Sequence, residues 1–138
     1  MAPGILGAVP RMAAMARPEF TCQVAVQYLP EQSQPQAGAF AFAYTVTIVN
    51  TGDVTAQLIA RHWIITDATG HTQEVRGLAV VGHQPLLKPG ERFEYTSWTR
   101  ISTPQGTMRG HYLCMTEHAE PFDAPVPEFM LALPGALH

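Results

Sequence analysis

Charged residues are scarce in this sequence. They make up 14% of the 138 residues, against roughly 25% in a typical soluble domain. The formal net charge is −3, from 8 Lys and Arg against 11 Asp and Glu. Because a nucleic-acid partner requires a basic surface that neutralises phosphates, this balance argues against nucleic acid as the partner.

Long apolar runs and a basic leader are also lacking. No stretch approaches the roughly 18 apolar residues of a membrane span. The first basic residue, Arg11, follows the apolar N-terminal stretch, whereas a secretory signal begins with basic residues. The 2 cysteines, Cys22 and Cys114, are far apart and lie in strand-like runs. We expect a cytoplasmic protein without a membrane segment, in which both thiols are reduced and buried.

A helical pattern is missing too, because apolar residues nowhere keep a 3.6-residue period over three turns. At Phe20 a different pattern begins, in which apolar and polar residues alternate as in a half-buried strand. Turn-forming Gly, Pro, Asn and Asp separate successive runs of this kind. The runs predict an all-β antiparallel sandwich of about seven strands. The expected strands are residues 20–28, 40–48, 54–67, 73–76, 92–100, 107–116 and 122–133.

Two of these runs carry further expectations. Run 54–67 is partly apolar on both faces, which is typical of a central strand. Unbroken alternation places Leu58 and His62 on one face of it and Trp63 on the other. Pro125 and Pro127 cannot donate to a sheet ladder, so the last run is expected to begin at a sheet edge.

Residues 1–18 differ in composition from the rest of the chain. They are rich in Ala, Gly, Pro and Met and show no sustained period. We predict a disordered N-terminal arm over residues 1–18 and one domain over residues 19–138.

The sharpest motif is Gly-Leu-Ala-Val-Val-Gly, from Gly77 to Gly82. It resembles the G-x-G-x-x-G fingerprint, in which a strand leads into a helix whose N-terminal N–H groups hold a pyrophosphate. Here Ala79 replaces the middle glycine and would crowd a phosphate, and Pro85 follows where the helix should form. Gly77 and Gly82 are thus a degenerate cofactor-binding pattern, and a glycine-bracketed strand or bulge is the better interpretation.

Patterns for catalysis and metal binding are weak. None of the 6 histidines shows the spacing of a zinc site, although His62 and His111 fall within strands and would meet if those strands were paired. No serine lies in a G-x-S-x-G elbow, and apolar neighbours flank Cys114. We expect no enzyme, no metal site and no cofactor.

Aromatic residues give the strongest indication of binding. Trp63, Trp98, Tyr95 and Tyr112 exceed what a modest core requires. An exposed patch that includes Trp63, Trp98 and Tyr95 would mark a partner surface, whereas burial of all four in the core is the alternative. An open edge strand is a second possible route, because it accepts a peptide as an added strand. Such edges are compatible with a monomer or a weak homodimer.

Several segments in combination resemble the ApaG family, also called CorD. They are residues 61–70, 80–85, 88–90, 93–97, 103–112 and 127–134, which include the sequences Arg-His-Trp-Ile-Ile-Thr-Asp-Ala-Thr-Gly and Val-Val-Gly-His-Gln-Pro. The resemblance begins near Phe20, and it implies an immunoglobulin-like, fibronectin type III-like β-sandwich. Family members often carry a fuller glycine motif, for which pyrophosphate binding has been suggested, and this chain departs from it at Leu78 and Ala79.

The resemblance also implies a role. In bacteria the family is linked to cobalt resistance and magnesium efflux, and by gene neighbourhood to diadenosine tetraphosphate hydrolysis. Related domains end some eukaryotic F-box proteins, where they resemble partner-binding modules. We expect a non-enzymatic binding module for a protein partner that acts in divalent-cation homeostasis. The alternative is a small-ligand protein that binds a pyrophosphate-containing nucleotide or a divalent metal.

Overall fold

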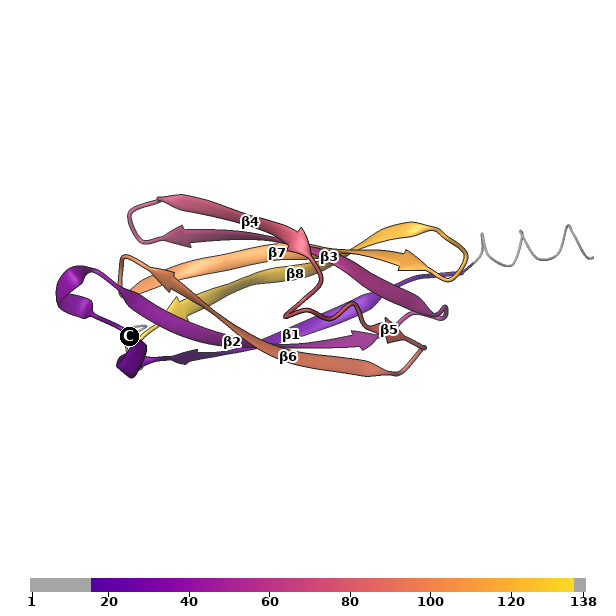
Figure 1. The fold of residues 1–138 in the computed structure, drawn as a ribbon, viewed down its shortest axis with the longest axis horizontal. Coiled ribbons are helices and arrows are strands. Elements are labelled where there is room, and N and C mark those ends of the chain that lie inside the picture. Colours follow the sequence, from indigo (N-terminus) through magenta and orange to yellow (C-terminus); the bar gives the residue numbers. More distant parts are fainter. Residues whose placement is uncertain (1–15, 136–138) are drawn as a thin grey trace, which may run out of the picture.

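Two antiparallel β-sheets form the domain in a computed structural model, which describes residues 16–135 (Figure 1). One sheet has the order β1-β2-β6, and its strands are β1 (Phe20–Tyr28), β2 (Phe40–Asn50) and β6 (Arg92–Ile101). The other has the order β4-β3-β7-β8, and its strands are β4 (Thr72–Leu78), β3 (Ala56–Asp67), β7 (Gln105–Thr116) and β8 (Pro121–Ala132). The short β5 (Leu86–Leu87) also pairs with β3, which makes this sheet five-stranded. The predicted antiparallel sandwich is confirmed.

The seven expected strands are all present, and each lies within a few residues of its predicted bounds. Strand β3 pairs with β4 on one side and with β7 on the other, so its predicted central position is confirmed. Strand β8, which contains Pro125 and Pro127, lies at the edge of its sheet as expected. Two short 3-10 helices, Pro30–Gln32 and Pro35–Ala37, connect β1 to β2. Within residues 16–135 the structure contains no apolar helix of membrane-spanning length.

The core lies between the two sheets and follows the period-two pattern of the strands. Alternate residues of β2 are buried, and they face inward-pointing residues of β3, β7 and β8 across the sandwich. This arrangement arises because successive side chains of a strand point to opposite faces of its sheet. The side chains that are fully buried include Phe42, Val46, Ile48, Leu58, Met108, Tyr112 and Leu131.

Strand β3 departs from the predicted alternation at a β-bulge. Its register against β7 shifts between Leu58 and Ala60, so Ile59 is an extra residue without an opposite partner. A bulge of this kind reverses the direction of every side chain that follows it. Leu58 and Trp63 therefore both face the core, and His62 faces outward, so the prediction that Leu58 and His62 share a face is wrong.

The turn after β2 explains why β5 is part of the sheet. Asn50 is 1% exposed, and its Nδ2 donates to the carbonyl oxygens of Val54, at 3.0 Å, and Leu87, at 2.9 Å. Because a buried carbonyl without a partner is costly, these two bonds hold β5 against the start of β3. Two residues are too few for the alternating pattern on which a strand prediction depends.

Most of the predicted N-terminal arm, residues 1–15, lies outside the described residues. The described part is in contact with the domain, because the N–H of Arg17 donates to Asp53 Oδ1 at 2.6 Å. The N–H of Asp53 in turn donates to the carbonyl oxygen of Arg17 at 3.2 Å. Contact with the domain therefore begins before the predicted boundary after Pro18.

Candidate functional site

An apolar row of side chains crosses the outer face of the five-stranded sheet. Ala60 on β3 is paired with Leu78 on β4 and with Leu113 on β7. Leu78 is 72% exposed and Leu113 is 43% exposed, while the small Ala60 lies between them. The row therefore has two large apolar side chains at its ends and a dip in the middle.

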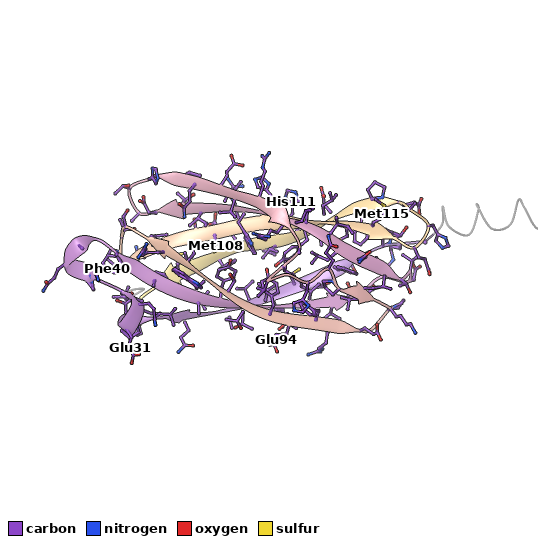
Figure 2. All side chains as sticks on the ribbon, viewed as in Figure 1. Glu31, Phe40, Glu94, Met108, His111 and Met115 are labelled. Atoms are coloured by element: carbon purple, nitrogen blue, oxygen red, sulfur yellow. The ribbon has the colours of Figure 1, made fainter. Side chains whose placement is uncertain are left out.

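A basic row lies beside the apolar one. Two residues after Ala60, His62 is paired with Arg76 on β4 and with His111 on β7. Side chains two residues apart in a strand share a face, so the two rows are neighbours on the sheet. In Figure 2 the labelled His111 and Met115 mark β7 on this side of the molecule, and Glu94 of β6 lies on the opposite side.

The two rows border an open hollow of about 660 Å³, which we call the outer hollow. Its position depends on the β-bulge, because the reversal after Ile59 brings Ala60 and His62 to the outer face. The residues that line it are Ala60, Arg61, His62, Arg76, Gly77, Leu78, His111 and Leu113. Its formal charges come from Arg61 and Arg76, and no acidic residue lines it, so the outer hollow favours an anionic group.

The histidine pair that the strand positions allowed is confirmed. The rings of His62 and His111 are perpendicular, with centroids 5.1 Å apart. His62 Nε2 lies 2.6 Å from Glu74 Oε2, and Arg76 Nη2 donates to the same oxygen at 3.2 Å. The hydrogen bond from His62 and the charge of Arg76 lower the pKa of the Glu74 carboxyl. Glu74 thus fixes the position of one imidazole and one guanidinium at the rim of the outer hollow.

More apolar surface extends from the outer hollow toward β5. On the same outer face, Gln57 is paired with Leu86 on β5 and with Met115 on β7. Leu86 is 63% exposed and Met115 is 36% exposed. This apolar surface was not predicted, because the sequence does not show that the outward residues of β5 and β7 lie side by side. The available signal was the pair Leu113 and Met115, which alternates with buried Cys114.

The glycine motif has a structural explanation that starts with Gly77. A Cβ at this position would lie 3.0 Å from both Nη1 and Nη2 of Arg61. Arg61 Nη1 donates to the carbonyl oxygens of Leu78, at 2.8 Å, and Ala79, at 2.9 Å. The Arg61 guanidinium therefore occupies the space that a side chain at position 77 would take, and its hydrogen bonds hold the end of β4.

The other positions of the motif are explained by backbone conformation. Ala79 has φ 68°, Val81 has φ 47° and Gly82 has φ 81°. Positive φ is the region in which glycine is favoured and a β-branched residue is strained. The segment continues into β5 with no helix, so the strand–turn–helix context of the phosphate fingerprint does not occur. Gly77 lines the outer hollow, whereas Gly82 does not.

Ala79→Gly is expected to stabilise the protein by about 0.5–1 kcal/mol. A left-handed conformation costs an L-residue about 1–2 kcal/mol, and the greater freedom of glycine in the unfolded chain offsets about half of this gain. Urea unfolding measures the difference. Ala43→Gly, in the interior of β2, is the matched control and should destabilise by a similar amount. A loss of stability in Ala79→Gly would contradict the backbone explanation of the motif.

Three of the four aromatic residues singled out for binding belong to the core. Trp63 is 2% exposed and Tyr95 is 8% exposed, so neither contributes to an exposed patch. Tyr112 is fully buried. Because Trp63 faces inward after the bulge, its ring packs against Tyr44 and Phe129. The buried Nε1–H of Trp63 has no hydrogen-bond partner among the described residues. Trp98 alone is on the surface, at 59% exposure, and its role in partner binding stays a prediction.

The thiols are poorly suited to nucleophilic chemistry. Cys114 is buried and Cys22 is half-buried, on strands of opposite sheets. Burial raises the pKa of each thiol to about 12. Since the thiolate is the reactive form, both cysteines are unreactive at neutral pH.

The most strongly shifted carboxyl holds a hairpin. Asp67 Oδ1 accepts hydrogen bonds from Thr69 Oγ1 at 2.7 Å, Thr69 N at 2.9 Å and His71 N at 3.0 Å. Ser102 Oγ donates to Asp67 Oδ2 at 2.9 Å. These bonds, first that of the Thr69 hydroxyl, lower the pKa of Asp67 to about 2. Its carboxylate therefore closes the β3–β4 turn and secures it to the end of β6.

No metal centre is evident in the described part of the chain. Over residues 16–135, no three His, Cys, Asp or Glu side chains are grouped so that they could hold a metal ion. The histidine pair supplies two nitrogens and Glu74 is already bonded to one of them. A tetrahedral protein site normally has three or four ligands.

Comparisons with known proteins agree on one family. A family model described as the ApaG domain matches residues 30–116. The protein named Protein ApaG from Ralstonia nicotianae is 63% identical over 124 residues, which cover 90% of this chain and 100% of that protein. Its namesake from Bordetella pertussis is 57% identical over 120 residues, or 87% of this chain and 92% of that protein.

A solved structure shows the same fold. It is the crystal structure of a protein from Bordetella pertussis that is described as ApaA, with 55% sequence identity and a TM-score of 0.84. The match covers 86% of this chain and 97% of that one.

Proposed function

The chain belongs to the ApaG family, and from this we propose that it is a non-enzymatic binding module whose partner is a protein, bound at the outer face of the five-stranded sheet. The observation that carries the proposal is the surface formed by the two rows and the outer hollow. Solvent-exposed apolar side chains are common singly, but a contiguous patch with a polar rim is typical of an interaction surface.

The composition of this surface supports a protein partner. Leu78 and Leu113 flank the dip at Ala60, and Leu86 and Met115 extend the apolar area toward β5. The basic row adjoins this area on its other side. Binding sites of proteins commonly combine an apolar centre with polar groups at the rim, and methionine and arginine are enriched in them.

The two thiols and the hydrogen-bonded carboxyls of Asp67 and Glu74 support a role without catalysis. Both thiols have a pKa raised to about 12 by burial. Asp67 is engaged by the hairpin, and Glu74 is bonded to His62 and Arg76. A catalytic acid or base requires a pKa near the working pH, and these groups are shifted away from it.

A small anionic ligand is the second candidate function. The two arginines of the outer hollow favour it, because they would attract phosphate groups. Two features weaken it: Arg61 already donates to two carbonyl oxygens, and the space that Gly77 leaves is occupied by that guanidinium. A nucleotide would thus bind to the surface of the sheet without the backbone cradle of the fingerprint.

The biological role that we propose is divalent-cation homeostasis in the cytoplasm. Its support is the resemblance to the ApaG family, which is linked to cobalt resistance and magnesium efflux. In this role the protein acts through a partner and does not bind the ion. We therefore expect calorimetric titration with Co²⁺, Mg²⁺ or diadenosine tetraphosphate to give no saturable heat, and a saturable isotherm would favour the small-ligand function.

Site-specific photocrosslinking in the protein's own cell tests the protein-binding function. A benzophenone amino acid at Leu113, in the apolar row, should yield a discrete adduct with another protein. The matched control is the same amino acid at Glu94, an exposed residue on the opposite side of the sandwich (Figure 2), which should not yield it. Absence of an adduct at Leu113, or the same adducts at both positions, would contradict the proposal. An adduct of twice the chain mass would identify a second copy as the partner.

A further inference from the structure

The outer hollow has a shape that suits one large apolar side chain. Ala60 contributes only a methyl group, whereas its neighbours on either side are leucines. Leu78 and Leu113 are both exposed, at 72% and 43%, so much of their apolar surface is still accessible to water. An apolar side chain placed over Ala60 would bury its own surface and part of both leucines, which is the dominant favourable contribution in most protein association.

The charged groups beside this dip indicate which residues of a partner should flank its apolar side chain. Arg76 is 73% exposed, and only Nη2 of its guanidinium is bonded to Glu74. His111 lies next to it across His62, and the carboxylate bonded to this row, that of Glu74, is outside the lining of the outer hollow. The chain as a whole has a net charge of −3, so this basic row contrasts with an acidic molecule. Anionic groups of a partner are favoured here, and cationic groups are repelled.

The basic groups are held in place before any partner binds. Glu74 Oε2 contacts His62 at 2.6 Å and Arg76 at 3.2 Å, and the His62 ring abuts that of His111 in a perpendicular arrangement. Groups that are already ordered lose little conformational freedom on binding. The row is thus a pre-organised contact for carboxylates that lie two residues along the strand from the apolar dip.

From this geometry we infer that the partner segment of the protein is acidic, with a bulky apolar side chain that lies over Ala60 between Leu78 and Leu113. Its flanking carboxylates contact Arg76 and His111, because His62 Nε2 is already bonded to Glu74. The inference rests on the proposed function and names the chemistry of its partner. It excludes a basic segment, because the Arg76 guanidinium would repel it.

Backbone amide NMR with two defined peptides tests the inference. The probes are acetyl-Glu-Glu-Leu-Phe-Glu-Glu-amide and the same peptide with lysine in place of each glutamate, each titrated into the ¹⁵N-labelled full chain. The acidic peptide should shift the amides of residues 60–62, 76–78 and 111–113, and the basic peptide should not. An absence of shifts with the acidic peptide, shifts that cluster elsewhere, or equal shifts with both peptides would overturn the inference.

A charge reversal supplies the matched variant. Arg76→Glu should weaken binding of the acidic peptide about ten-fold or more, because one attractive contact becomes a repulsive one. Arg92→Glu is the same change on β6 of the other sheet and should leave the affinity unchanged. Equal effects of the two variants would overturn the inference. Both side chains are exposed, and the amide spectrum itself reports whether each variant is folded.

The two tests separate the inference from the function on which it rests. A crosslinked protein partner at Leu113 together with no response to the acidic peptide would overturn the acidic segment and leave partner binding in place. A missing adduct at Leu113 would contradict partner binding itself.

Discussion

Gly110→Ala should destabilise the domain by about 3 kcal/mol or more, a large fraction of the 5–15 kcal/mol that holds a typical domain folded. A Cβ on Gly110 would overlap the carbonyl oxygen of His62 and lie 2.9 Å from Cε3 of Trp63. Gly110 is paired with Trp63 across β7 and β3, so relief would require these central strands to separate. Urea unfolding, or soluble yield if the variant does not fold, measures the effect.

The matched control is Gly77→Ala. Its new Cβ would approach only the guanidinium of Arg61, at 3.0 Å, which is the flexible end of a side chain. We expect a loss of about 1 kcal/mol, because Arg61 would give up hydrogen bonds to Leu78 and Ala79 at the end of β4. If Gly110→Ala lowers the free energy of unfolding no more than Gly77→Ala does, β3 and β7 do not approach as closely at Gly110 as this structure shows.

Tyr95→Phe or Tyr112→Phe should each cost about 2 kcal/mol. The two hydroxyls are buried between the sheets, with their oxygens 2.5 Å apart, and burial raises the pKa of both. Removal of one hydroxyl leaves the other without its partner in the core, and an unsatisfied buried group costs about 1–3 kcal/mol. Equilibrium unfolding of each variant checks the value.

The double variant Tyr95→Phe/Tyr112→Phe distinguishes a lost pair from lost packing. It removes both hydroxyls, so no polar group is left unsatisfied, and it should be more stable than the sum of the single losses implies. The coupling between the two sites should be about 1 kcal/mol or more. Additive losses would show that the hydroxyls contribute independently and that the bond between the sheets is unimportant.

The strands were predictable because one face of each sheet is buried and the side-chain period is two. The bulge at Ile59 was not, because no glycine or proline marks it in the sequence. Its effect extends along β3: Leu58 and Trp63 share the core although their positions differ by an odd number. Strand β5 was also missed, since it is held by Asn50 rather than by its own pattern.

The candidate site was less predictable than the fold. Strand membership of His62 and His111 was clear, but their pairing depends on the register that follows the bulge. The glycine motif pointed to a segment that borders the outer hollow, but its glycines are not there to bind a phosphate. Gly77 leaves space for the Arg61 guanidinium, and Gly82 has positive φ. Composition alone did not show that Trp98 is exposed and Trp63 buried. That distinction depends on the face of the sheet to which each side chain points.

The pairing of β2 with β6 has a consequence for how fast the domain forms. Thr45 and Thr96 bond across this ladder although they are 51 residues apart, and β3, β4 and β5 of the other sheet lie between them in the chain. The hairpin of β3 and β4 needs only a short loop, whereas the three-stranded sheet must close a long one before its contacts compensate for the lost chain entropy. We expect folding on the millisecond-to-second scale of such topologies, with the β2–β6 ladder among the last parts to form.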